Sequence, residues 1–259
     1  STKYLGARFD IHGGGLDLVF PHHEAEIAQS CASDGHEAVN YWMHNNMITI
    51  NGQKMGKSLG NFITLSEFFS GNHDKLEQAY NPMTIRFFIL QAHYRSTVDF
   101  SNEALLAAEK GMNKLMAALE TLEGLTVSDN STVNVEDFKT KFYSAINDDF
   151  NTPILVAHLF DAVKQINSIS AGKGSIDKAS KEALTKLMND FCFDILGLKK
   201  VAAEAQDGLT DEVMDVVLGL RKIAKENKDW TTADFIRDEL GKLNITVKDS
   251  KDGASWEKE

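Results

Sequence analysis

The chain has 259 residues, and its 27 lysines and arginines against 38 aspartates and glutamates give a formal net charge of −11. A hydrophobic fraction of 42% and a charged fraction of 25% are ordinary for a globular protein that buries a core. A run of about 18 uncharged apolar residues is absent and the first residues lack a secretion-signal core, so we expect no membrane partner. Two cysteines, Cys31 and Cys192, are too few for a disulfide framework and fit a cytoplasmic protein.

The first part of the chain is rich in histidine and should carry a site. Seven of the eight histidines lie in the first 93 residues. Here the pattern predicts a strand at 8–12 ending in a glycine turn at 13–15, a helix at 22–33 opened by Pro21, a strand at 43–50 followed by a hairpin turn at 51–52, and helices at 65–69 and 82–94.

The second part should be helical. All three prolines lie at or before residue 153, and leucines and methionines recur at helical spacing over 102–122. Residues 124–134 are polar and are expected to form a linker. The remaining pattern predicts helices at 135–147, 153–170, 175–196, 210–227 and 231–243, with a small terminal hairpin at 246–248 and 254–256.

His22 and Glu26 are the first candidates for chemistry. On a helix, residues four apart share a face, so the two side chains would project together as zinc ligands do. Two ligands do not complete a zinc site, and a solvated acidic first turn explains the same residues. Cys31 falls on another face of this helix and is expected to be a small packed residue.

Two glycine-containing segments are candidates for nucleotide binding. Gly13–Gly15 would let a ligand approach the backbone, and Asp17 just beyond could bind ribose hydroxyls, although on the pattern alone a tight turn is the favoured interpretation. Residues 51–61 hold three glycines and two lysines, which could fold over a triphosphate or form an exposed basic hairpin.

Residues 219–251 carry eight basic and six acidic side chains, a local charge of +2 in an acidic protein. Trp230 and Phe235 add aromatic surface, so an RNA contact is conceivable from pairing with phosphates and stacking on bases. From these residues alone, a mixed-charge helix face with a buried tryptophan is the favoured interpretation.

Together these segments resemble one family. Residues 9–26 (FDIHGGGLDLVFPHHEAE) resemble the signature of the cysteinyl-tRNA synthetases, and residues 41–44 (YWMH) with 54–62 (KMGKSLGNF) resemble that family's version of the class I KMSKS loop. Residues 93–96, 99–101 and 148–153 match further landmarks, and the resemblance runs from Tyr4 to Trp256. Gly56 departs from the common serine of the loop.

The resemblance implies an α/β remnant of a class I Rossmann-type catalytic domain, a mainly α-helical bundle and a small C-terminal anticodon-binding region. The implied divisions are 1–65 (catalytic part), 66–123 (stem-contact-type helices), 135–200 (DALR-like bundle) and 210–259 (anticodon binding). Family members begin with a half that carries the HIGH motif and a zinc-binding cysteine. A second zinc-binding cysteine follows shortly before the segment that Ser1 matches. We therefore expect a C-terminal portion that is inactive alone.

The resemblance also implies roles for particular residues. His22 and Glu26 match two of four zinc ligands, and Lys54 and Lys57 match the catalytic lysines over ATP. The matched ATP or adenylate residues are His12, Gly13, Gly14, Asp17 and Lys57, and those of the anticodon end are Lys225, Trp230, Asp234 and Asp249.

The implied function is cysteine–tRNA ligation: cysteine and ATP, as its magnesium complex, form cysteinyl-adenylate, and the cysteinyl group passes to tRNA-Cys. We expect a monomer. Three alternatives remain: a non-catalytic tRNA-binding module, a zinc hydrolase that would need a third ligand, and the cysteine ligase of mycothiol biosynthesis. That last enzyme should lack a full anticodon-binding tail, so the stretch at 219–251 favours the tRNA enzyme.

Overall fold

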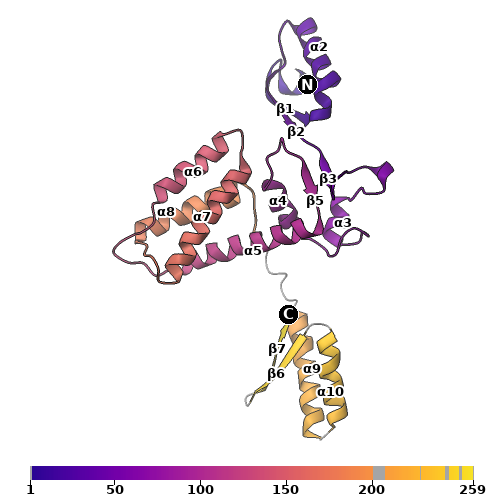
Figure 1. Ribbon diagram of the computed structural model, residues 1–259, viewed down its shortest axis with the longest axis vertical. Helices are drawn as coiled ribbons and strands as arrows, with labels where there is room; N and C mark the ends of the chain where they lie inside the picture. The colour runs from indigo at the N-terminus through magenta and orange to yellow at the C-terminus, as the bar shows by residue number, and fades with distance from the viewer. Residues whose placement is uncertain (1, 201–207, 228, 243–244, 251–252, 259) are drawn as a thin grey trace. The chain divides into compact units, whose positions relative to one another are not determined.

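The computed structural model describes residues 2–200, 208–227, 229–242, 245–250 and 253–258 (Figure 1). The chain forms two compact units, Ser1–Lys200 and Val201–Glu259. Each unit has its own core and is described by itself.

The first unit begins with α1 (Thr2–Leu5) and a two-stranded parallel sheet of β1 (Phe9–Gly15) and β2 (Val39–Asn45). The chain crosses from one strand to the other through η1 (Leu16–Leu18), η2 (Val19–His23) and α2 (Glu24–Asp34). The expected turn at 13–15 is wrong, because these glycines continue β1 and pair with residues 43–45 of β2. The helix expected at 22–33 is confirmed: His22 and His23 belong to η2, which continues directly into α2, and the peptide bond between Phe20 and Pro21 is cis.

A second sheet has the order β4–β3–β5, from β3 (Ile48–Ile50), β4 (Gln53–Lys54) and β5 (Val98–Phe100). The single strand expected at 43–50 is therefore two strands. Asn46 and Met47 separate them, and the backbone N–H of Asn46 donates to the Tyr94 carbonyl at 2.9 Å. The turn between β3 and β4 is confirmed, with φ of 50° at Asn51 and 76° at Gly52, as a two-residue hairpin requires.

Short helices η3 (Lys57–Leu59) and α3 (Leu65–Ser70) follow this hairpin. Thr64 caps α3, and its side chain and backbone exchange hydrogen bonds with Glu67 in a capping box. The hairpin and α3 share a core that includes Ile50, Phe68 and Phe100.

The larger core belongs to a helical bundle of α4 (Pro82–Leu90), α5 (Asn102–Gly124), α6 (Val135–Asn147), α7 (Thr152–Ser170), α8 (Lys178–Asn189) and η4 (Asp190–Ile195). Side chains of Asn81, Ser101, Asn134 and Asp177 cap four of these helices. The expected helices are confirmed closely, except that α4 ends at Leu90 and the helix expected at 175–196 begins at Lys178 and is divided into α8 and η4.

The corner between α6 and α7 is tied to the segment after α4. Asp149 accepts a hydrogen bond from the Tyr94 hydroxyl at 2.7 Å and pairs with Arg95 at 2.9 Å. Asp149 and Phe150 have φ of 52° and 54°, which non-glycine residues rarely adopt. The ion pair and hydrogen bond help to hold this corner.

The second unit consists of α9 (Gly208–Glu226), α10 (Trp230–Lys242) and an antiparallel hairpin of β6 (Ile245–Ser250) and β7 (Gly253–Lys258). Met214, Leu218 and Leu240 form its small core. The terminal hairpin expected from the sequence is confirmed and is longer than predicted. Across the described part of the chain, the helices fall short of the length and apolar character that a bilayer crossing demands.

The two cysteines differ in environment. Cys31 is exposed, so the expectation of a packed residue is wrong, whereas Cys192 is buried. Burial raises the pKa of the Cys192 thiol to about 12. Because the thiolate is the reactive form, we expect a thiol reagent at neutral pH to label one cysteine of the native chain and the second only after unfolding. Titration before and after adding denaturant measures this, and Cys31→Ser should abolish the native signal.

Candidate functional site

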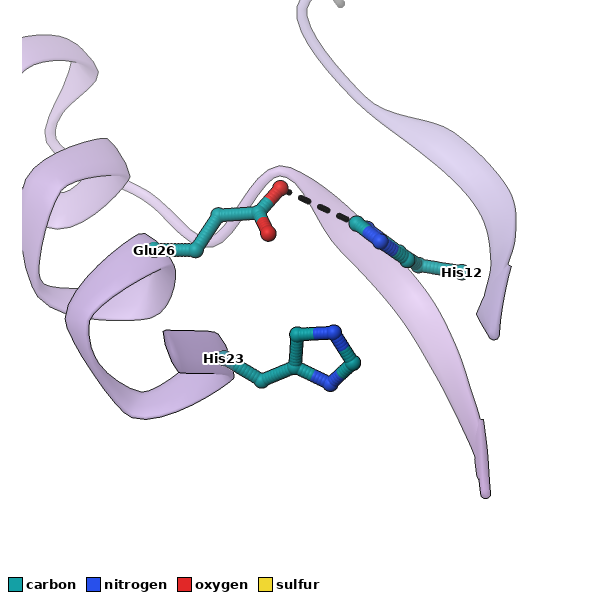
Figure 2. A group of neighbouring side chains, drawn as sticks. All are labelled: His12, His23 and Glu26. Atoms are coloured by element: carbon teal, nitrogen blue, oxygen red, sulfur yellow. Dashed lines mark ion pairs between the residues drawn. The ribbon is translucent and has the colours of Figure 1, made fainter. Parts of the chain in front are cut away.

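Three side chains from β1, η2 and α2 converge at the first sheet. The donor atoms of His12, His23 and Glu26 all lie within 4.8 Å of one another. Figure 2 shows His23 and Glu26 reaching from the helical segment toward His12 on the strand. Histidine nitrogens and a carboxylate oxygen are ligands that zinc accepts.

The contacts within this histidine cluster leave ligand atoms available. The Glu26 Oε1 atom lies 3.4 Å from His12 Nδ1, and that nitrogen is buried without a hydrogen-bond partner. The other ring of the cluster, His23, is bonded through Nδ1 to His44 Nε2 at 2.8 Å. Burial, and next the neighbouring His12 and His44, lower the pKa of His23, which favours the neutral ring that binds metals.

Trp42 packs against two histidines of the cluster. Its ring stacks on His12 with centroids 4.7 Å apart and lies 4.8 Å from the ring of His23. Trp42 and His44 are two residues apart on β2, so the alternation of the strand places both rings on the same face, toward His23.

The glycines of β1 make room for this cluster. A Cβ atom at Gly14 would lie 2.8 Å from His23 Cε1 and 2.9 Å from Leu18 Cδ1, and one at Gly15 would collide with the Asp17 carboxylate. Gly14 is therefore required by the packing of the buried His23 ring against the strand, whereas the exposed Asp17 side chain can move away from a residue at Gly15. The predicted contact of His12, Gly13, Gly14 and Asp17 with a nucleotide stays a prediction.

The metal pair expected from the sequence is only partly reproduced. His22 and Glu26 line the same surface hollow along α2, together with Gln29. The ligand group formed by the described residues contains Glu26 but pairs it with His12 and His23. Sequence spacing misses this group because His12 lies on a strand, fourteen positions before Glu26. Its one signal is the histidine directly before the glycines.

The two lysines of the loop lie on successive elements. Lys54 ends β4, Lys57 starts η3, and both are exposed. The Lys57 ammonium lies 5.4 Å from the ring centroid of Phe62, so the aromatic ring supports the charge on one side. Both cations are open to an anionic ligand.

Gly56 lies between them in ordinary extended backbone, with φ of −164°. A Cβ atom there would meet Leu59 Cδ1 at 3.8 Å, which is normal contact. We therefore expect Gly56→Ser to change the free energy of unfolding by less than about 1 kcal/mol and to leave the loop at least as ordered. Denaturant titration and tryptic cleavage after Lys57 measure this; faster cleavage would contradict it.

The candidate residues of the second unit lie mostly on α10. Trp230 is 59% exposed and Phe235 63% exposed, so the alternative of a buried tryptophan is wrong. Asp234 pairs with Arg237 at 3.2 Å. Lys225 lies in the last turn of α9, and the side chain of Asp249 on β6 lies outside the described residues. Both rings are exposed, and because residues five apart on a helix point in different directions, each ring is available for stacking separately.

Comparisons with known proteins agree along the chain. Residues 1–110 match the tRNA synthetases class I (C) catalytic domain, 141–200 the DALR domain and 206–256 the cysteinyl-tRNA ligase anticodon binding domain. The chain is 59% identical over 256 residues to a cysteine–tRNA ligase of Bacteroides fragilis, covering 98% of this chain and 52% of the relative.

Two further relatives carry the same description. One from Porphyromonas gingivalis is 58% identical over 256 residues, covering 98% of this chain and 52% of the relative. One from Chlorobaculum tepidum is 44% identical over 269 residues, covering 100% and 52%. The chain thus spans about half the length of the curated relatives it matches.

Proposed function

Because the chain belongs to the cysteinyl-tRNA synthetase family, we propose that it supplies part of an enzyme that joins cysteine to tRNA-Cys at the expense of ATP. The observation that carries this proposal is the exposed lysine pair, with Lys54 at the end of the β3–β4 hairpin and Lys57 at the start of η3, in one chain with an aromatic-bearing anticodon domain. A class I catalytic portion, a DALR domain and an anticodon-binding domain follow one another. The finer division at 1–65, 66–123, 135–200 and 210–259 stays a prediction.

The reaction needs positioning and charge rather than a protein nucleophile. The cysteine carboxylate attacks the α-phosphate of ATP, giving cysteinyl-adenylate and pyrophosphate. A hydroxyl of the terminal tRNA adenosine then attacks the acyl carbon and releases AMP. Lys54 and Lys57 would stabilise negative charge on the phosphates, and the backbone around Gly13 and Gly14 would line the adenylate.

A zinc ion would fit the residues near Glu26. The orphaned buried Nδ1 of His12 and the gathered donors of His23 and Glu26 suit a cation. Glu26 would be a ligand together with His22, as the resemblance implies, or with His12 and His23, as the geometry favours. When bound, zinc supplies a preference for a thiolate over a hydroxyl, which separates cysteine from serine.

Partners follow from this function. ATP would enter as its magnesium complex, and the protein would act in the cytoplasm as a monomer. The tRNA would contact the second unit, where Lys225, Trp230, Asp234 and Asp249 are the proposed anticodon residues. Exposed rings on α10 support stacking, which is worth about 1–3 kcal/mol per base.

Binding of tRNA-Cys tests the second-unit assignment. We expect Trp230→Ala to weaken binding about tenfold, because one stacked base would be lost. Fluorescence anisotropy with labelled tRNA-Cys at fixed salt measures the dissociation constant. Tyr4→Ala, which removes an exposed ring of the first unit, is the control. Equal affinity for tRNA-Cys and an unrelated tRNA would count against the proposal.

The alternatives differ from it in ways that the same chain can test. A tRNA-binding module has no use for Lys54 and Lys57, so binding of ATP at these lysines separates the two functions. The match of residues 206–256 to an anticodon-binding domain favours the tRNA enzyme over the mycothiol-pathway ligase. A hydrolase could use the histidine cluster, but the relatives are described as ligases.

A further inference from the structure

Residues 51–61, here called the lysine loop, combine exposed cations with flexible backbone. Gly52 and Gly60 adopt φ of 76° and 64°, and Gly56 separates the two lysines. Glycine increases the conformational freedom that a loop must lose when it binds a ligand. The side chains of Asn61 and Asp99 limit this freedom.

Asn61 closes the loop from within. It is only 3% exposed. Its Nδ2 donates to the Lys54 carbonyl at 3.0 Å, and its Oδ1 accepts from the Gly56 N–H at 2.9 Å. One carboxamide thus bonds the backbone on both sides of Met55, whose own N–H donates to the Ile48 carbonyl and whose side chain packs on the core.

Asp99 holds the opposite end of the loop. Its Oδ1 accepts from the Gly52 N–H at 2.8 Å and from the Thr49 hydroxyl at 2.6 Å. Asp99 lies on β5, which pairs with β3 directly beside the hairpin. The hairpin turn is therefore fastened to a strand that comes almost fifty residues later.

We propose that Asn61 and Asp99 are positioning residues that hold the lysine loop in the shape with which Lys54 and Lys57 contact the phosphates of ATP. The inference rests on the proposed function for the phosphate contact only. The hydrogen bonds fix the carbonyl of Lys54 itself and the residue before Lys57, so they set the backbone from which both ammonium groups project. A preformed loop loses less entropy on binding.

Trypsin reports on this loop directly, because it cleaves after lysine and needs an unfolded segment. In the 259-residue chain, the rates of cleavage after Lys54 and Lys57 are measured by mass spectrometry, with cleavage after the exposed Lys173 as internal reference. We expect Asn61→Ala to raise cleavage in the loop about tenfold relative to Lys173, since two hydrogen bonds are lost. The exposed Asn72→Ala is the matched control and should leave the rates unchanged.

Asp99 provides a second test, in which the buried Asn61 is left unchanged. Asp99→Ala should raise loop cleavage several-fold, whereas Asp99→Asn keeps an acceptor oxygen and should remain close to the unsubstituted chain. A rise at Lys173 as large as that in the loop would mean general unfolding, and equal rates for Asp99→Ala and Asp99→Asn would overturn the assignment of Asp99.

Protection by magnesium–ATP shows whether Asn61 positions the lysines for binding phosphate or only stabilises the loop. ATP should slow loop cleavage in the unsubstituted chain, and the ATP concentration that halves the rate should rise at least threefold in Asn61→Ala, because misplaced lysines bind phosphate less well. An unchanged half-protecting concentration, or unchanged cleavage without ATP, would overturn the inference. If ATP does not protect the unsubstituted chain, the proposed phosphate contact is wrong, and the cleavage rates without ATP still decide whether Asn61 and Asp99 hold the loop.

Discussion

Replacing Glu26 by glutamine is expected to lower the affinity of the chain for zinc by about 100-fold. A carboxylate brings both charge and a strong oxygen donor, and a neutral carboxamide keeps only a weaker donor. Changes that merely remove partners of metal ligands cost 10–100-fold, so loss of a direct ligand should reach at least the upper end of that range. Competition with a chelating dye measures the affinity.

Two further substitutions identify the ligands that accompany Glu26. His12→Ala should weaken zinc binding strongly if the cluster on β1, η2 and α2 holds the ion, whereas His22→Ala should do so if the spacing along the helix decides. His36→Ala, in an exposed loop, is the control. A chain that loses affinity with His22→Ala and keeps it with His12→Ala would contradict the geometric ligand set, and unchanged affinity in Glu26→Gln would contradict both sets.

Replacing Phe142 by alanine is expected to lower the free energy of unfolding of the first unit by about 3–5 kcal/mol. The side chain is fully buried in the helical bundle, and its ring meets that of Phe191 edge to face with centroids 5.1 Å apart. Removing the ring loses apolar burial, leaves a cavity and breaks the aromatic pair. Denaturant titration followed by circular dichroism measures the change.

A surface substitution on the next helix provides the control for this prediction. Ile154 is 46% exposed on α7, so Ile154→Ala should cost less than about 1 kcal/mol. Similar losses for Phe142→Ala and Ile154→Ala would show that the bundle core is not centred where the structure places it.

The helices were predictable because their signals are local. Leucines and methionines at helical spacing predict 102–122, and the structure has Asn102–Gly124. The helix expected at 135–147 has those bounds, set by an asparagine cap at one end and by the Asp148–Asp149 corner at the other. Periodicity and capping residues lie within the segment that they describe.

Features that depend on distant pairing were missed. The strand Val98–Phe100 has three residues and exists because β3 offers it a partner. The glycines 13–15 look like a turn from their composition, but β2 extends them as a strand. The histidine cluster has the same cause, since the crossover between β1 and β2 returns α2 to the strand that bears His12.

Exposure of single residues was also beyond the sequence. Cys31 was expected to be packed and is exposed, and Trp230, for which the residues alone favoured a buried ring, is exposed as well. The position of a residue on a helix fixes the direction of its side chain, but whether another part of the fold covers that face depends on neighbours that are distant in the sequence. The roles predicted for Lys54, Lys57 and the residues of the anticodon end remain predictions, because they concern ligands.

The ties of the segment after α4 have a mechanical consequence. Asn46 lies between β2, the strand that bears His44, and β3, the strand that leads into the lysine loop. Its backbone N–H donates to the Tyr94 carbonyl at 2.9 Å, and its Nδ2 donates to the Arg95 carbonyl at 3.0 Å. The side chains of the same two residues grip Asp149 at the bundle corner. A force that displaces the corner between α6 and α7 must therefore either break the contacts of Tyr94 and Arg95 with Asp149 or act on Asn46, which lies between the two sheets.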